Sequence, residues 1–389
     1  MKQKRKSRGM LQASWTDELK RTIQLNIKGK TISFQPVRLG AMLAGILLAL
    51  ILLVNILLIP VKRPKTLDMG FETGGEYTIR PFMSHALLYN RRQMREVTVT
   101  GKTLWEAEIT MSHPIMEIAD QYILLADLSG NNAGVLYKKG KKIREFTPEN
   151  DIISAKVNAK GMTAFATATV GYKGKVIVYD KKGKEKFNWN SGEGYILDIA
   201  LDDSGRYLAV AQLSSDGTES NSKLQMIDLN RKRVIATEER PGTAISEIRF
   251  SGKRLMSVSD TEFCGFKPSG KLLFSVPFGG RNPSKYDISG NEIFAFVTTD
   301  NRGNAVLELY NNKGKQVGKY RADSTVNNLS VHKDTIVIAR QRDVISINRR
   351  GKLKKTVSAE FDIKSLGLYG DGRTVLAAGN TLAYIARVK

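Results

Sequence analysis

Cysteine is almost missing from this chain of 389 residues, in which Cys264 is the only one. A disulfide within the chain is therefore impossible, and cysteine-based metal clusters and redox pairs are excluded. Cys264 lies in the apolar run Phe263-Cys264-Gly265-Phe266, and we predict that it is a small buried hydrophobe.

Histidine is also scarce, with His85, His113 and His332 far apart in the sequence. They lack the two-ligand spacing of a zinc helix and an obvious nucleophile as partner, so we interpret them as structural or surface residues. Aspartate and glutamate are scattered without the spacing of a calcium loop. The sequence therefore predicts no catalytic residue, no metal site and no cofactor, and we expect a protein that is not an enzyme.

Helical periodicity is missing after residue 70, where short β-type runs alternate with turns. One kind of turn recurs every 37 to 49 residues, as a glycine followed by lysine, with Arg231-Lys232-Arg233 in the single vacant slot. Strand-rich repeats of this length are typical of propeller blades, because one blade cannot bury both of its faces until neighbours stack on it. The pairs are Gly101-Lys102, Gly140-Lys141, Gly183-Lys184, Gly270-Lys271, Gly314-Lys315 and Gly351-Lys352.

The number of β-type runs sets the number of blades. About thirty strands can be counted, near the thirty-two of eight four-stranded blades, so we predict an all-β propeller of eight blades, with seven as the alternative. The last repeat is one strand short, and a strand near Glu76 to Phe82 would complete it and close the ring. The polar stretch from Gln212 to Lys223 is predicted to be a flexible loop between two strands of one blade.

A run without charge precedes the repeats, from Leu39 to Val61. As a helix it would be about 34 Å long, which is enough to cross a bilayer. The predicted organisation is a basic cytoplasmic tail at 1–38, a transmembrane helix at 39–61, a linker at 62–69 and a propeller at 70–389. The tail has ten lysines and arginines against two acidic residues, so the positive-inside rule places it in the cytoplasm and the propeller outside, at the cell membrane.

Basic residues are concentrated in the turns between the third and fourth strands, which project from one face of a propeller. We predict that these turns form a ring that binds a polyanion; the alternative is that lysine only keeps the turns soluble and unpaired. The candidate residues are Lys138, Lys139, Lys141, Lys142, Lys181, Lys182, Lys184, Arg231, Lys232, Arg233, Arg349, Arg350 and Lys352.

The same turns carry a family resemblance. Thr100-Gly101-Lys102-Thr103-Leu104-Trp105 resembles the repeat of pyrroloquinoline-quinone-type propellers, whose turn glycine is followed four residues later by a docking tryptophan. The resemblance implies that Trp105, and phenylalanine in the same slot at Phe187 and Phe274, dock the blades. The anchored ring also resembles uncharacterised single-pass propeller proteins of Gram-positive bacteria. The WD40 pattern fits less well, because the chain has no Trp-Asp dipeptide.

Three functions remain open at this stage. We expect a non-catalytic binding or scaffold module for envelope proteins or an anionic cell-wall polymer, without a nucleic-acid partner. The alternative is a sensor that relays an external ligand to a cytoplasmic partner through the helix. A quinone-dependent dehydrogenase is the weakest, because a lone Cys264 cannot form the disulfide of adjacent cysteines found in many such enzymes.

Overall fold

The structure is a computed structural model that describes residues 23–27, 30–34, 44–50, 65–68, 77–215, 217, 219–300 and 302–389. Two compact units divide the chain, Met1–Arg63 and Pro64–Lys389. The first unit holds the antiparallel pair β1 (Ile23–Ile27) and β2 (Lys30–Phe34) and a short helix at residues 44–50.

The predicted transmembrane helix falls largely on residues that the structure does not describe. Of Leu39 to Val61, residues 44–50 are described, and the remainder lies outside the described residues. Within the described part of the chain, no helix is both long and apolar enough to cross a membrane. The transmembrane segment stays a prediction.

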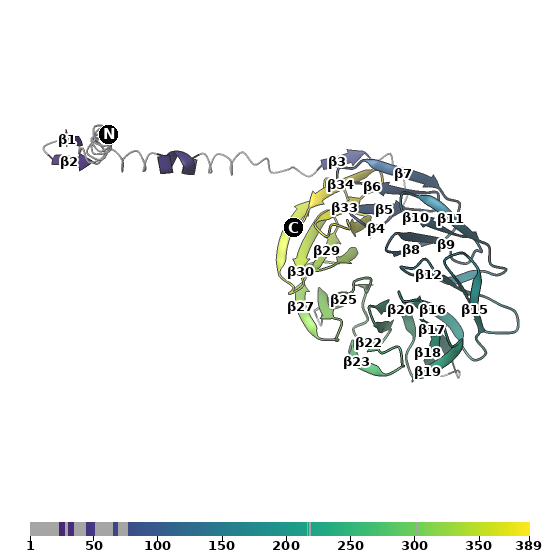
Figure 1. Cartoon of the computed structure of the whole chain (residues 1–389). Coiled ribbons are helices and arrows are strands. Elements are labelled where there is room, and N and C mark those ends of the chain that lie inside the picture. Colours follow the sequence, from purple (N-terminus) through teal and green to yellow (C-terminus); the bar gives the residue numbers. More distant parts are fainter. Residues whose placement is uncertain are drawn as a thin grey trace, which may run out of the picture. The chain divides into compact units, whose positions relative to one another are not determined.

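The second unit is an eight-bladed propeller, as predicted, with eight four-stranded antiparallel sheets around one axis (Figure 1). Each blade runs from an inner strand at the axis to an outer strand at the rim. Blades 1 to 4 are formed by β4 (Thr78–Phe82), β5 (His85–Tyr89), β6 (Gln93–Val97), β7 (Thr103–Glu108); β8 (Pro114–Ala119), β9 (Tyr122–Asp127), β10 (Ala133–Tyr137), β11 (Lys141–Phe146); β12 (Ile152–Val157), β13 (Thr163–Thr167), β14 (Lys175–Tyr179), β15 (Glu185–Asn190); and β16 (Tyr195–Leu201), β17 (Tyr207–Ser215), β18 (Ser220–Asp228), β19 (Arg233–Arg240).

The other four blades repeat the same order, and the last one takes its outer strand from the beginning of the unit. Blades 5 to 8 are formed by β20 (Ile245–Ser251), β21 (Arg254–Ser259), β22 (Glu262–Phe266), β23 (Leu272–Pro277); β24 (Lys285–Asp287), β25 (Ile293–Thr299), β26 (Ala305–Asn311), β27 (Gln316–Arg321); β28 (Asn328–His332), β29 (Thr335–Arg340), β30 (Asp343–Asn348), β31 (Leu353–Ser358); and β32 (Ser365–Leu368), β33 (Thr374–Ala378), β34 (Leu382–Arg387), β3 (Lys65–Asp68).

The strand that closes the ring is not the one predicted. β3 pairs with β34, with Lys65 opposite Ile385 and Asp68 opposite Leu382, so it completes blade 8 from within the predicted linker at 62–69. The predicted closing strand near Glu76 to Phe82 is instead β4, the inner strand of blade 1. A four-residue outer strand with a charge at each end lacks the apolar alternation that marks a strand in a sequence.

The predicted loop from Gln212 to Lys223 is also wrong. β17 and β18 are nine residues long and stay paired as far as Ser215 opposite Ser220. Gln212 is buried, and its side-chain amide donates to the Ser191 hydroxyl at 2.5 Å. Polar side chains at these positions resemble a loop in the sequence, although Gln212 and Ser222 bond to the connections before and after the blade from within a long hairpin.

The core consists of the second and third strands of each blade, which neighbouring blades cover on both faces. Every residue of β13 and of β33 is buried. These strands are therefore apolar almost continuously instead of alternating, as expected for strands buried on two sides. Outer strands such as β31 are mostly exposed.

Antiparallel order gives the propeller two distinct faces. We define the front face as the face that carries two kinds of turn in each blade: the turn from the first to the second strand and the turn from the third to the fourth strand. The rear face carries the turns from second to third strands and the connections between blades. Each blade has the same up-and-down path, so all turns of one kind lie on one face.

Candidate functional site

Five of the seven front-face turns between third and fourth strands share one geometry, closed by two backbone hydrogen bonds; the turns of blades 2 and 4 differ. In three of them an Asp or Asn accepts hydrogen bonds from the backbone N–H groups two and four residues later. Asp180 Oδ1 lies 2.8 Å from the nitrogen of Lys182 and 2.9 Å from that of Lys184. Asn348 Oδ1 makes the same pair of contacts, at 2.9 and 3.0 Å. Asn311 does so at 2.9 and 3.1 Å.

Glycine is required in these turns, because the residue three positions after the Asp or Asn has a positive φ. Gly183 has φ +84° and Gly351 has φ +78°. The N–H bonds from Lys184 and then Lys182 outweigh partial desolvation and hold the pKa of the Asp180 carboxyl below its usual range. A turn fixed in this way presents the side chains around its glycine to solvent, and those side chains are mostly lysine and arginine.

All thirteen predicted polyanion-binding residues are exposed in the structure. Lys142 pairs with Glu145, and Arg231 lies 3.9 Å from Asp228. The Lys138 ammonium lies 5.5 Å from the centre of the Tyr137 ring. The exposed residues are Lys138, Lys139, Lys141, Lys142, Lys181, Lys182, Lys184, Arg231, Lys232, Arg233, Arg349, Arg350 and Lys352.

Charge differs sharply between the two faces. In the front-face turns basic residues outnumber acidic ones by about three to one. The front-face acidic residues are Asp120, Asp180, Asp202, Asp203, Glu292, Asp334 and Asp371. The rear face has an acidic excess, since Glu149, Asp151, Glu193, Glu219, Asp260, Asp300, Asp323, Glu360 and Asp362 are set against Arg91, Arg92, Lys173, Arg281, Arg302, Arg342 and Lys364.

The aromatic residues of the turn repeat lie between blades. A Cβ added to Gly140 of blade 2 would lie 2.5 Å from the Trp105 ring of blade 1, and Trp105 Nε1 donates to the buried Glu96. Phe274 of blade 5 lies against Gly314 of blade 6 in the same way, at 2.4 Å from the added Cβ.

The other blades place different residues at this slot. Phe187 of blade 3 is buried in a cluster with Ile227 and Leu229 of blade 4. Arg144 of blade 2 contacts Gly183, and Ala236 of blade 4 contacts Gly270. Outside the glycine-free turn of blade 4, the residue four positions after one turn glycine covers the turn glycine of the next blade, which fixes neighbouring basic turns side by side.

A charged cluster that sequence reasoning missed lies at the axis. Glu117 on β8 contacts Lys156 Nζ on β12 at 3.2 Å and Arg249 Nη2 on β20 at 3.0 Å. Lys156 also lies 3.3 Å from Asp198 on β16, so the ion pairs join four blades. Burial by itself would raise the pKa of Glu117, but the charges of Lys156 and Arg249 outweigh it and lower this pKa to about 2.

The cluster lies beneath the front opening of the axis, where a cavity of about 310 Å³ is lined by Glu117, Lys156 and Arg249 among others. The sequence marks this cluster only through position: Glu117 and Arg249 each stand two residues before the end of the inner strand of their blade. A second cavity, of about 540 Å³, opens on the rear face beside Arg80, Lys285 and Lys364.

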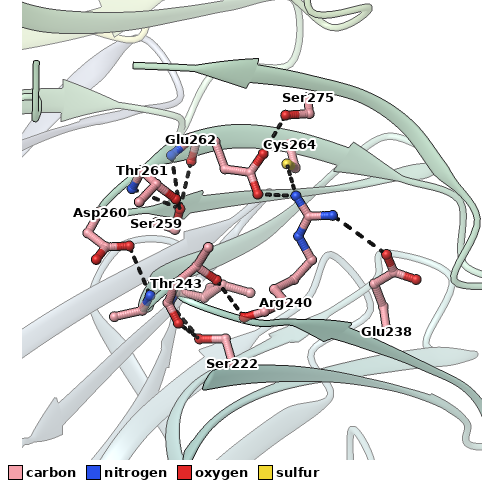
Figure 2. A network of polar contacts seen from close by, with 12 residues as sticks. Ser222, Glu238, Arg240, Thr243, Ser259, Asp260, Thr261, Glu262, Cys264 and Ser275 are labelled. Carbon is pink, nitrogen blue, oxygen red and sulfur yellow. Dashed lines mark hydrogen bonds and ion pairs between the residues drawn. The ribbon is translucent and has the colours of Figure 1, made fainter. Parts of the chain in front are cut away.

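Cys264 is buried, as predicted, and it belongs to a polar network between blades 4 and 5 (Figure 2). Arg240 at the end of β19 pairs with Glu262 on β22 and lies 3.8 Å from Cys264 Sγ. Burial, together with the nearby Glu262 carboxylate, raises the pKa of the Cys264 thiol to about 12. The thiol is therefore protonated at neutral pH and is a poor nucleophile.

Metal-binding groups do not gather in the described part of the propeller. No three His, Cys, Asp or Glu side chains among the described residues are placed to hold an ion. His85 Nδ1 contacts Glu96 at 2.6 Å, and His332 Nε2 lies 3.2 Å from the Gly370 carbonyl oxygen.

Comparison with known proteins places the chain in a family. The family of unknown function DUF5711 matches residues 65–383. The chain belongs to this family. No curated protein matches the chain. Among solved structures, the DUF5711 propeller is similar to the C-terminal WD40 domain of Sif2, with a TM-score of 0.59 and 14% identity over 85% of this chain and 99% of that one. This similarity shows a WD40-like propeller fold, and the family match begins at the first residue of β3.

Proposed function

We propose that this protein is a non-catalytic scaffold that residues 39–61 anchor in the cell membrane, with its propeller outside the cytoplasm. The front face binds an anionic partner, and the rigid disc displays other surfaces to envelope proteins. The observation that carries this proposal is the charge contrast between the faces, with thirteen exposed candidate cations in the outer turns of the front face or at the starts of the strands that follow them. A field of one sign over one face attracts polyanions and orients them.

Binding of a soluble polyanion tests the scaffold. The full-length protein, in detergent, should bind teichoic acid at low salt and release it as salt rises, because screening shortens the reach of exposed charges to about 8 Å at physiological ionic strength. Lys313 is also exposed, in the front-face turn between β26 and β27. Reversal to glutamate of Lys138, Lys181, Lys313 and Arg350 should weaken this binding at least tenfold.

A matched rear-face variant provides the control. Reversal of Arg91, Lys173, Arg302 and Lys364 changes the net charge by the same amount and affects exposed residues. Equal losses in the two variants would show that net charge alone drives association and would contradict a front-face site.

Topology has its own test. Protease added outside intact cells should digest the propeller and spare residues 1–38. A propeller that is protected until the membrane is opened would reverse the proposed orientation.

A further inference from the structure

The direction of β3 shows where the chain enters the propeller. β34 begins after the rear-face turn at residues 379–381 and runs towards the front face. β3 is antiparallel to it, with Asp68 opposite Leu382 and Lys65 opposite Ile385, so Lys65 lies at the front-face end of the outermost strand.

A second contact supports this direction. Just beyond the end of β34, the Lys389 ammonium lies 2.7 Å from Asp334 Oδ1. Asp334 belongs to the turn between β28 and β29, which is a first-to-second turn of the front face. The chain therefore joins the propeller at the face that carries the basic turns.

The connection to the proposed anchor is short. Lys62, Arg63 and Pro64 are the residues between Val61 and Lys65. The four Cα–Cα steps from Val61 to Lys65 span at most about 14 Å, so a helix that ended at Val61 would keep the front-face end of β3 within about that distance. With the proposed anchor, Lys62 and Arg63 would add two basic residues next to the bilayer.

Charge then decides how the tethered propeller lies. Each lysine or arginine near an anionic bilayer surface is attracted to it, and the attraction falls off within a Debye length. The basic excess is on the front face and the acidic excess is on the rear face, so both faces favour the same orientation.

We infer that the front face binds the phosphate headgroups of the bilayer that holds residues 39–61, so that the propeller lies flat on the membrane and its rear face is turned outwards. This inference rests on the proposed function, because it uses the same anchor and the same basic face. A wall polymer carries phosphates too, but beside β3 it would have to enter a gap of at most about 14 Å. Lipid headgroups are already there.

Distance measurements on the full-length protein test the inference. Ser269 is exposed in the front-face turn between β22 and β23, and Ser215 is exposed at the rear-face end of β17. Ser269→Cys and Ser215→Cys each provide a site for a fluorescent donor, since the buried Cys264 thiol is protonated at neutral pH. The protein is placed in nanodiscs of phosphatidylcholine with or without phosphatidylglycerol, with energy acceptors on the lipid headgroups.

With phosphatidylglycerol present, transfer from Ser269→Cys should exceed transfer from Ser215→Cys at least twofold. The difference should fall in pure phosphatidylcholine and in about 1 M salt, where the Debye length is about 3 Å. Reversal of Lys138, Lys181, Lys313 and Arg350 should abolish it, and reversal of Arg91, Lys173, Arg302 and Lys364 should leave it unchanged.

Other outcomes overturn the inference. Equal transfer from the two sites, or stronger transfer from Ser215→Cys, would show that the front face does not lie on lipid. If teichoic acid still bound to the front face in that case, the proposed function would stand and the lipid assignment would fail. Release of the protein from membranes by alkaline carbonate would contradict the anchor, and with it both proposals.

Discussion

At the scale of single residues, contact between Trp105 and Gly140 limits what the turn glycine can become. Gly140 has φ +73°, and an added Cβ would lie 2.5 Å from the Trp105 ring. Gly140→Ala should destabilise the propeller by roughly 2–4 kcal/mol, because backbone strain adds to a steric clash. The measurement is urea unfolding, followed by tryptophan fluorescence.

Gly171 is the control that separates the two causes. It has φ +82°, and nothing lies within 4 Å of an added Cβ. Gly171→Ala should therefore cost about 1 kcal/mol through backbone strain alone. Equal losses at the two positions would mean that Trp105 yields easily and does not hold the blades in register.

Glu117, also at the scale of single residues, makes a pH-dependent contribution to the stability of the propeller. Its pKa is about 2 in the folded chain against an ordinary value of 4.5, so its contribution is complete above about pH 4.5 and is lost as the pH falls towards 2. Wild-type stability should decline over this window. Glu117→Gln should remove that part of the decline in stability. It should cost about 1.5–3 kcal/mol at pH 7, because the half-buried Lys156 and Arg249 lose a charged partner while Lys156 keeps Asp198.

Thermal unfolding between pH 2 and 7 makes this comparison. Glu145→Gln is a suitable control, because Glu145 lies on the exposed outer strand β11 and contacts the exposed Lys142. A pH profile for Glu117→Gln that matches the wild type would contradict the assignment.

At the scale of elements, the hairpin of β17 and β18 extends beyond the length of other blade hairpins. Its base is tied to the next blade, since the Ser222 hydroxyl donates to the Thr243 carbonyl at 2.9 Å and accepts from the Ile245 N–H at 2.8 Å. Replacing residues 215–220 by a two-residue turn should change the melting temperature little. A deletion that reaches Gln212 and Ser222 should lower it by several degrees, because buried polar partners are lost.

At the scale of the whole molecule, β3 holds the ring closed. A chain that begins at residue 69 lacks this strand and leaves the edge of β34 open. Compared with a chain that begins at residue 64, it should melt at a lower temperature and form dimers or aggregates through the open edge. Differential scanning fluorimetry and size-exclusion chromatography make the comparison. Equal melting temperatures and equal elution volumes would show that blade 8 is stable with three strands.

The sequence predicted the fold well where one signal repeats. The turn glycines recur because positive φ is needed in these turns; six turns between third and fourth strands carry one, and Lys232 takes the positive φ in blade 4. The cluster of Glu117, Lys156 and Arg249 could not be predicted in the same way, because each is a single charge in a separate inner strand. Their proximity depends on how the strands meet at the axis. β3 was missed because a short outer strand buries little apolar surface and leaves no periodic pattern.

The pairing of β3 with β34 in blade 8 also sets the order in which the propeller can fold during synthesis. Lys65 pairs with Ile385, some 320 residues later, so the first strand of the propeller has no partner until almost the whole unit has been made. Seven blades can form as the chain emerges, but the circle cannot close before β34 is available. A chain that stalls short of residue 382 retains an unpaired β3, because its partner strand β34 has not been made. Ring closure thereby distinguishes finished copies from unfinished ones.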